Sequence, residues 1–302
     1  MKNFFKKLLA GVGIGVGAAV PGVSGAAIAV IFKIYEDIIN SINFLFKKFK
    51  ESIRTLLPVL LGIIIAVIPC IWLFDKALNY FLFATMCIFA GFLIGSIPSV
   101  QSEIKEEKFT KNRKIALICG VFVVILIGVG SVLIGQQINL DSIFQQHPAW
   151  LFAVLIPVGF IAAVALTIPG LSGSLILLLI GFYKPLVHYV VEWAKSNQWG
   201  TLFCAIGSFA LGVVLGIVLI SKVMGKLIEK HRAITYFAIF GFIIGSIGVL
   251  FFNSDIFKYY ISWSNGTQIG LKPYIEILIG LGAGILAFII SRYLIKKSLK
   301  NN

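Results

Sequence analysis

The stretch GVGAAVPGVSGAAIAV, residues 15–30, places a proline, a glycine and a serine in the middle of an apolar segment. A second stretch, AAVALTIPGLSGSLILLL at residues 162–179, repeats nearly the same pattern. Proline lacks the N–H that a helix interior needs, and its ring clashes with the preceding turn. Each stretch therefore predicts a break between two helical legs. These two breaks decide how the rest of the chain must be arranged.

Long apolar runs surround the breaks. The chain has 302 residues, of which 59% are hydrophobic and 13% charged, whereas soluble domains are about half apolar and a quarter charged. A helix of about 20 residues spans a hydrocarbon core of about 30 Å. The runs lie near 56–74, 77–97, 115–134, 200–221, 233–252 and 273–295. The sequence therefore predicts an all-α polytopic membrane protein.

The two halves of the chain repeat one another. The Pro-Gly-x-Ser-Gly pattern at 21–25 recurs at 169–173, and Tyr35 and Tyr183 follow at equivalent distances. Further along, AGFLIGSIP matches FGFIIGSIG in the same order. We predict two copies of one unit, each with a broken hairpin and three spans. The copies are residues 1–147 with hairpin 8–46, and residues 148–302 with hairpin 148–194.

Lysine and arginine indicate the side on which each loop lies. Most of the 26 gather in the N-terminus, 47–54, 105–114, 222–232 and 292–300. Because these residues favour cytoplasmic loops, a topology with all five segments inside makes the first hairpin enter and leave from the cytoplasm. Three spans later, the second hairpin enters from outside, and both termini are cytoplasmic.

An odd number of crossings inverts the second copy relative to the first. Inverted repeats with broken helices are typical of secondary transporters, whose sites lie near the bilayer midplane. The hairpin legs run near 8–20 and 25–39, and near 149–168 and 174–193. These lengths leave open whether the legs are re-entrant or cross fully.

The residues of each break have the chemistry of an anion site. Proline ends the first leg, glycine permits a tight turn, and serine can cap the second leg or bind a ligand. The free N–H groups at the start of the second leg favour phosphate or carboxylate. We expect the two tips to face each other; the alternative is a plain kink with serine bonded to its own backbone. The candidate phosphate-binding residues are Pro21, Gly22, Ser24, Gly25, Pro169, Gly170, Ser172, Gly173 and Ser174.

A second group of polar residues follows each tip. These residues lie about 15 Å beyond the tip by helical rise, so they are either interfacial or functional. The lysines could attract a phosphate, the histidine or a carboxylate could carry a proton, and the tyrosines could form an aromatic belt. The group comprises Lys33, Tyr35, Glu36, Tyr183, Lys184 and His188.

The net charge and the cysteines bear on which partners and cofactors the protein has. The net charge of +14 lies in short loops, which indicates topology and contact with anionic lipids and argues against nucleic-acid binding. The four cysteines lie in apolar runs without a CxxC pattern, so we expect packing roles, with no metal and no cofactor. The start MKNFFKKLLAGVGIGVGAAV imitates a signal peptide, but the Pro-Gly-x-Ser-Gly segment recurs inside the chain as part of the fold. We therefore expect no cleavage, which would leave the second copy of that segment unmatched.

The two breaks and their flanking residues resemble those of a known bacterial family. VPGVSGAAIAVIFKIYEDII and IPGLSGSLILLLIGFYKPL are similar to the signature hairpins of the polyprenyl-phosphate transporters, specifically the undecaprenyl-phosphate translocases. The resemblance covers essentially the whole chain. The family's first tip usually continues Ser-Gly-Gly-Thr, whereas here it reads Ser24-Gly25-Ala26-Ala27. Fewer hydroxyls on the first side predict unequal contributions from the two tips.

The resemblance implies a function and a location. It implies a non-enzymatic protein of the bacterial cytoplasmic membrane that flips undecaprenyl phosphate, the C55 lipid carrier, from the outer to the inner leaflet. The carrier is then reused in cell-wall polymer synthesis. By motif, the tip residues would hold the phosphate headgroup. A homodimer remains an open alternative for the assembly.

Two other functions compete with this interpretation. Undecaprenyl-pyrophosphate phosphatases have a similar turn, PG-x-SRS, but Gly25 and Gly173 stand here where their arginine would be. No acidic cluster precedes either tip, and phosphoryl-transfer chemistry normally needs Arg, Lys or a metal. A carrier for a small soluble anion is the second alternative, because the tips alone would suit one.

Overall fold

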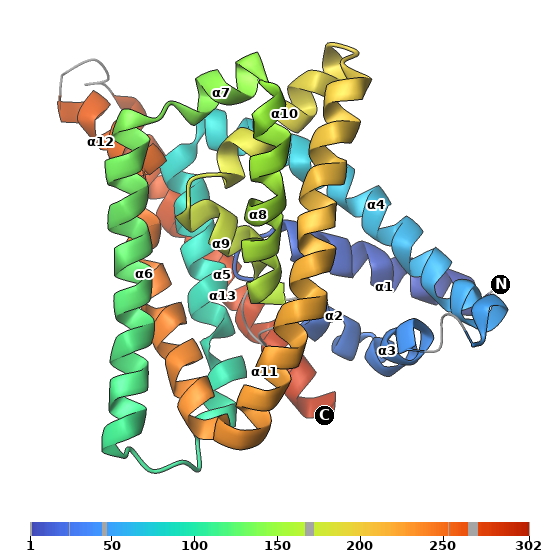
Figure 1. The fold of residues 1–302 in the computed structure, drawn as a ribbon. Helices are drawn as coiled ribbons and strands as arrows, with labels where there is room; N and C mark the ends of the chain where they lie inside the picture. The colour runs from blue at the N-terminus through green and yellow to red at the C-terminus, as the bar shows by residue number, and fades with distance from the viewer. Residues whose placement is uncertain are drawn as a thin grey trace.

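The computed structural model describes residues 2–23, 25–43, 47–166, 172–252, 254–264 and 271–301. These residues are overwhelmingly helical and include no strand, which confirms the predicted all-α class (Figure 1). Within these described ranges, six helical segments are long and apolar enough to cross a membrane, and each contains most or all of one predicted run. They are Phe49–Tyr80, Leu82–Ile104, Lys111–Leu133, Trp199–Ile220, Glu229–Ser262 and Pro273–Lys297.

The elements follow one another with short connections. In chain order they are α1 (Lys2–Ala19), α2 (Gly25–Ile31), α3 (Tyr35–Asn43), α4 (Phe49–Tyr80), α5 (Leu82–Ile104), α6 (Lys111–Gln137), α7 (Leu140–Gln146), α8 (Ala149–Leu166), α9 (Gly173–Leu179), α10 (Tyr183–Lys195), α11 (Trp199–Val249), a 3₁₀ turn (Leu250–Phe252), α12 (Ser254–Ser264) and α13 (Leu271–Asn301). Helix α11 turns back on itself at His231, whose φ/ψ of −137°/41° is not helical.

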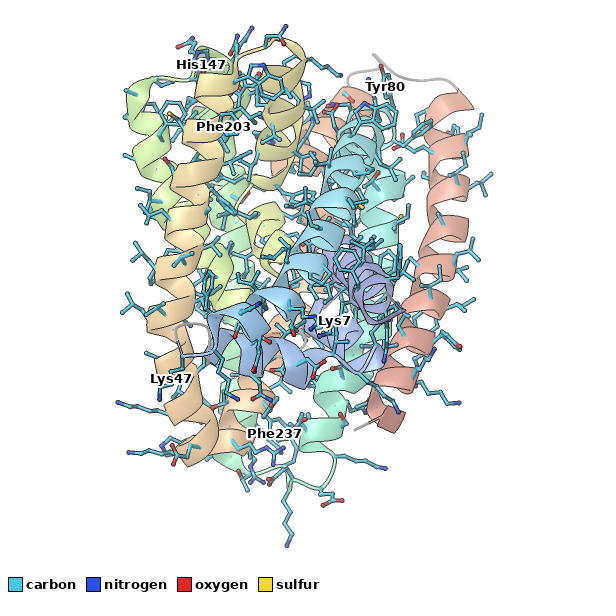
Figure 2. All side chains as sticks on the ribbon, turned by 90° about the vertical axis from the view of Figure 1, so that its right-hand side faces the viewer. Lys7, Lys47, Tyr80, His147, Phe203 and Phe237 are labelled. Carbon is cyan, nitrogen blue, oxygen red and sulfur yellow. The ribbon has the colours of Figure 1, made fainter. Side chains whose placement is uncertain are left out.

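The connections fall at two opposite ends of the molecule. Figure 2 shows Lys47 and Phe237 toward one end, and Tyr80 and His147 at the other. The predicted topology requires that residues 47–54 and the turn near His231 lie at the same end of the molecule. Which end faces the cytoplasm stays a prediction.

The hydrophobic core is built largely from side chains of α5, α9 and the second half of α11. Phe89, Leu93, Leu175, Leu178 and Ile243 are almost completely buried there. All seven residues of α9 are buried. The outer helices instead expose large apolar side chains, as expected for a protein surrounded by lipid. Cys87 is buried, whereas Cys119 and Cys204 are exposed.

Glycines let helices approach closely at equivalent places in the two halves. Helix α1 packs on α4, and α8 packs on the first half of α11. A Cβ on Gly11 would lie 2.2 Å from the Val59 carbonyl oxygen, and one on Gly159 would lie 2.2 Å from the Phe209 carbonyl oxygen. Gly11 and Gly159 are equivalent in the predicted repeat, and so are Val59 and Phe209. These matched contacts support the division at residue 147, which stays a prediction.

The second leg of each hairpin is bent, which corrects the continuous legs 25–39 and 174–193 of the sequence interpretation. Lys33 (φ 55°) and Gly181 (φ 81°) are left-handed and stand at equivalent positions. The residue that follows each of them donates its backbone N–H to a carbonyl five positions earlier. Ile34 donates to Ala29, and Phe182 donates to Leu177. This is a helix-ending hydrogen bond, so each leg stops after two turns. Helices α9 and α10 meet at 104°.

Candidate functional site

The first tip follows α1 and lies against α5. Pro21 and Gly22 are buried, and Gly22 has a φ of 90°. A Cβ on Gly22 would lie 2.9 Å from the backbone nitrogen of Leu93, so both the backbone conformation and the space require glycine here. Gly25 begins α2. Ser24 lies outside the described residues.

The second tip leads into α9. Ser172 stands in the extended conformation of an N-cap but makes no capping hydrogen bond through its side chain, so of the two roles that the sequence allows this serine, capping is not observed. Its hydroxyl instead lies 2.6 Å from the hydroxyl of Ser174, and both serines are buried. Gly173 is the first residue of α9. Pro169 and Gly170 lie outside the described residues.

Two hydroxyls of the second hairpin close the end of α1. The last turn of a helix leaves carbonyls without N–H partners, and Pro21 has no N–H to offer. The hydroxyl of Ser174 donates to the Ala18 carbonyl at 3.3 Å, and that of Tyr183 donates to the Ala19 carbonyl at 2.8 Å. These two bonds join the second hairpin to the residues that precede the tip of the first hairpin.

Tyr183 is not an interfacial belt residue. Its exposed fraction is 4%, and its ring packs edge-on against Phe89 with centroids 6.1 Å apart. The estimate of about 15 Å from the tip assumed a straight leg. The bend at Gly181 turns α10 so that the hydroxyl reaches the carbonyl next to the one bound by Ser174. Tyr35, the equivalent residue of the first half, is 43% exposed.

The other residues beyond the tips occupy different environments. Lys33 is exposed at its left-handed break, and Lys184 is partly buried in the first turn of α10. The side chain of Glu36 lies outside the described part. Within that part, no three His, Cys, Asp or Glu side chains could hold a metal ion together.

His188 has a carboxylate partner that sequence reasoning missed. Its Nδ1 lies 2.6 Å from Oδ1 of Asp75 on α4. The Asp75 side chain is only 4% exposed and also accepts a hydrogen bond from Asn79 at 2.9 Å. The predicted runs 56–74 and 77–97 left Asp75 in a loop between them. In the structure α4 continues to Tyr80, which places the carboxylate inside the helix.

Glu276 is a second buried carboxylate that the sequence reasoning missed. It is 1% exposed and accepts the backbone N–H groups of Phe83 at 2.8 Å and Ala84 at 3.4 Å. The hydroxyl of Tyr259 also donates to it. A carboxylate from α13 therefore satisfies free N–H groups at the start of α5. Its sequence signal was a lone acidic residue at the beginning of an apolar run.

Comparisons with known proteins agree on one family. A family model described as undecaprenyl phosphate translocase-like matches residues 14–269. A polyprenyl-phosphate transporter of Staphylococcus aureus is 29% identical over 252 residues, covering 81% of this chain and 85% of the relative. A polyprenyl-phosphate transporter of Vibrio cholerae is 28% identical over 286 residues, covering 89% and 84%. No solved structure matches the chain.

Proposed function

Because this chain belongs to the undecaprenyl phosphate translocase-like family, we propose that it flips undecaprenyl phosphate from the outer to the inner leaflet of the bacterial cytoplasmic membrane. Its relatives are named transporters of polyprenyl phosphate, and the chain is likewise a polyprenyl-phosphate transporter rather than an enzyme. The lipid returned in this way would re-enter cell-wall polymer synthesis.

The junction of the two hairpins is the observation that carries the proposal. Ser172 and Ser174 form a buried hydroxyl pair beside the end of α1, in the part of the molecule where the two broken helices meet. Hydroxyls and free backbone N–H groups are suited to phosphate oxygens. A phosphate would replace the Ala18 carbonyl as the acceptor of the Ser174 hydroxyl.

Alternating access follows from the predicted inverted repeat. A charged headgroup is costly to move through hydrocarbon, whereas the prenyl chain stays in the bilayer. Only the headgroup therefore needs a protein-lined path, which the two hairpins would open alternately to each side. The proposed headgroup residues are the nine at the two tips, with Lys33 and Lys184 guiding the phosphate toward them.

The proposed orientation places both termini and the basic loops in the cytoplasm. Lysine and arginine in those loops would contact anionic lipid headgroups. A homodimer is compatible with this arrangement.

A double variant, Ser24→Ala with Ser172→Ala, tests the proposal. The measurement is the fraction of undecaprenyl phosphate exposed in the outer leaflet of cells, with membrane insertion checked in parallel. The variant should leave more carrier exposed than the wild type, while Ser102→Ala, whose hydroxyl bonds only within its own helix in the described contacts, should not. Wild-type clearance by the double variant would mean that the tips are only kinks.

Purified protein separates the competing functions. The transporter proposal expects no phosphate release from undecaprenyl pyrophosphate, which a phosphatase would catalyse. It also expects no uptake of inorganic phosphate into liposomes, which a carrier of soluble anions would support. Robust turnover in either assay would overturn a function restricted to lipid transport.

A further inference from the structure

A hydrogen-bonded contact between an imidazole and a buried carboxylate joins α10 of the second hairpin to α4 of the first half, away from the tip serines. His188 Nδ1 and Asp75 Oδ1 are 2.6 Å apart, and Asn79 Nδ2 lies 2.9 Å from the same oxygen. Asp75 is 4% exposed and His188 35% exposed. A buried carboxylate is costly unless it is paired, so the charge of the imidazole strongly affects this contact.

The imidazole also borders a polar pocket. This cavity of about 310 Å³ is lined by His188 together with Gln145, Tyr189, Glu192, Ser196 and Gln198. Helices α7 and α10, which supply most of the lining, lie together at one end of the molecule (Figure 1). His188 therefore connects an accessible polar cavity with a carboxylate that is otherwise sealed inside the protein.

The groups around His188 come from several elements. Helix α4 supplies Asp75 and Asn79. Helix α10 itself supplies Glu192 and Tyr189, and the ring centroid of Tyr189 is 5.0 Å from that of the imidazole. Helix α7 contributes Gln145, and Gln198 precedes α11. Helix α9, with the sequence GSLILLL, has no titratable side chain. Asp75 is the carboxylate in direct contact with the imidazole.

Helix α10 links this contact to the tips. Tyr183, in its first turn, bonds the Ala19 carbonyl at the end of α1, and His188 follows five residues later on the same short helix. A displacement of α10 that separates His188 from Asp75 would also pull on the Tyr183 bond. The two contacts can therefore be made and broken together.

We propose that Asp75 and His188 form a proton-binding site that couples proton movement to transport. This inference rests on the proposed lipid-phosphate function. With a proton bound, the imidazolium donates to the Asp75 carboxylate and holds α10 against α4. Loss of the proton removes the charge attraction and favours conformations in which the hairpin moves. A proton that binds one conformation more tightly than the other is bound or released when the protein changes between the two conformations. If the lipid drives that change, lipid movement and proton movement are coupled.

The test uses proteoliposomes containing undecaprenyl phosphate. A water-soluble phosphatase added outside measures the fraction of lipid in the outer leaflet. For the wild type, a pH difference of one unit should change the ratio between leaflets by up to about tenfold per coupled proton. Asp75→Asn should exchange lipid without responding to the gradient. Glu106→Gln, at an exposed position that does not line this pocket, should respond as the wild type does.

The outcomes separate the two proposals. Lack of exchange by the wild type under every gradient would overturn the transport function itself. Exchange by the wild type with an equal gradient response in Asp75→Asn would overturn only the proton site. His188→Gln gives the same comparison where Asp75→Asn fails to fold. A pH-sensitive dye trapped inside wild-type vesicles provides an independent readout, and lipid movement without proton movement would also refute the coupling.

Discussion

The hydroxyl of Tyr183 donates a hydrogen bond of 2.8 Å to the backbone carbonyl of Ala19, 164 positions earlier in the chain. This bond supplies a donor to a carbonyl in the last turn of α1, because the N–H of Val23, four residues on, bonds Val20 instead. It also ties the bend of the second hairpin to the break of the first. Together with the bond from Ser174 to Ala18, the Tyr183 phenol joins the two hairpins at their breaks.

Tyr183→Phe should lower the free energy of unfolding by about 1–3 kcal/mol, because the Ala19 carbonyl loses its donor in a buried place. Lipid transport should fall as well, since the two hairpins lose a connection. Unfolding in mixed micelles measures the first effect, and the leaflet assay measures the second.

Tyr35→Phe is the matched control for this change. Tyr35 occupies the equivalent position and is 43% exposed, so its substitution should alter stability by less than about 0.5 kcal/mol. Equal losses in the two variants would contradict a special role for the Tyr183 hydroxyl.

Gly22→Ala should destabilise the protein by about 1–3 kcal/mol, because alanine is strained at a φ of 90°. Its Cβ would also meet the Leu93 backbone at 2.9 Å. The yield of folded protein in detergent provides the measurement. Gly130→Ala, where the added Cβ meets nothing within 4 Å, should be neutral or stabilising. A tolerated Gly22→Ala would show that the tip can relax.

Gly11→Ala and Gly159→Ala should cost similar amounts, about 1–3 kcal/mol each. Both methyl groups would lie 2.2 Å from a carbonyl oxygen of the facing helix. Thermal unfolding of the two variants, compared with Gly207→Ala in open space, measures the costs. Loss of stability in only one variant would count against the repeat as a packing unit.

Glu276→Gln should lower the free energy of unfolding by about 1 kcal/mol, because an amide oxygen accepts more weakly than a carboxylate from the N–H groups that begin α5. Glu276→Ala should cost more, since it removes the acceptor. Chemical unfolding provides the measurement. Glu106→Gln, at an exposed position, should leave stability within about 0.5 kcal/mol, and a comparable loss there would remove the argument for capping.

Single cysteines, introduced after replacement of the four native ones, test the orientation. A membrane-impermeant maleimide added to intact cells should label Gln145→Cys, because this residue is exposed on α7, in the segment that is predicted to face outward. It should label Lys108→Cys only after permeabilisation. The reverse pattern would invert the proposed topology.

Local patterns in the sequence were enough to predict the fold class. Apolar runs identified the membrane-spanning helices because a bilayer requires about 20 apolar residues in a row. Proline and glycine marked the hairpin breaks for the equally local reason that they disrupt helical hydrogen bonds. Gly181 was a visible signal for the second bend, whereas Lys33, at the equivalent position, carried none.

The contacts of the candidate site required the tertiary structure. Asp75 and His188 are 113 positions apart, and Tyr183 and Ala19 are 164 apart, so no local pattern indicates their proximity. The sequence by itself determined the membrane-spanning helices and the break at Pro21-Gly22, because these depend on neighbouring residues. Only the tertiary structure decided which side chains meet at the breaks, because a bend of 104° after α9 sets the direction of α10 and so its partners on α1 and α4.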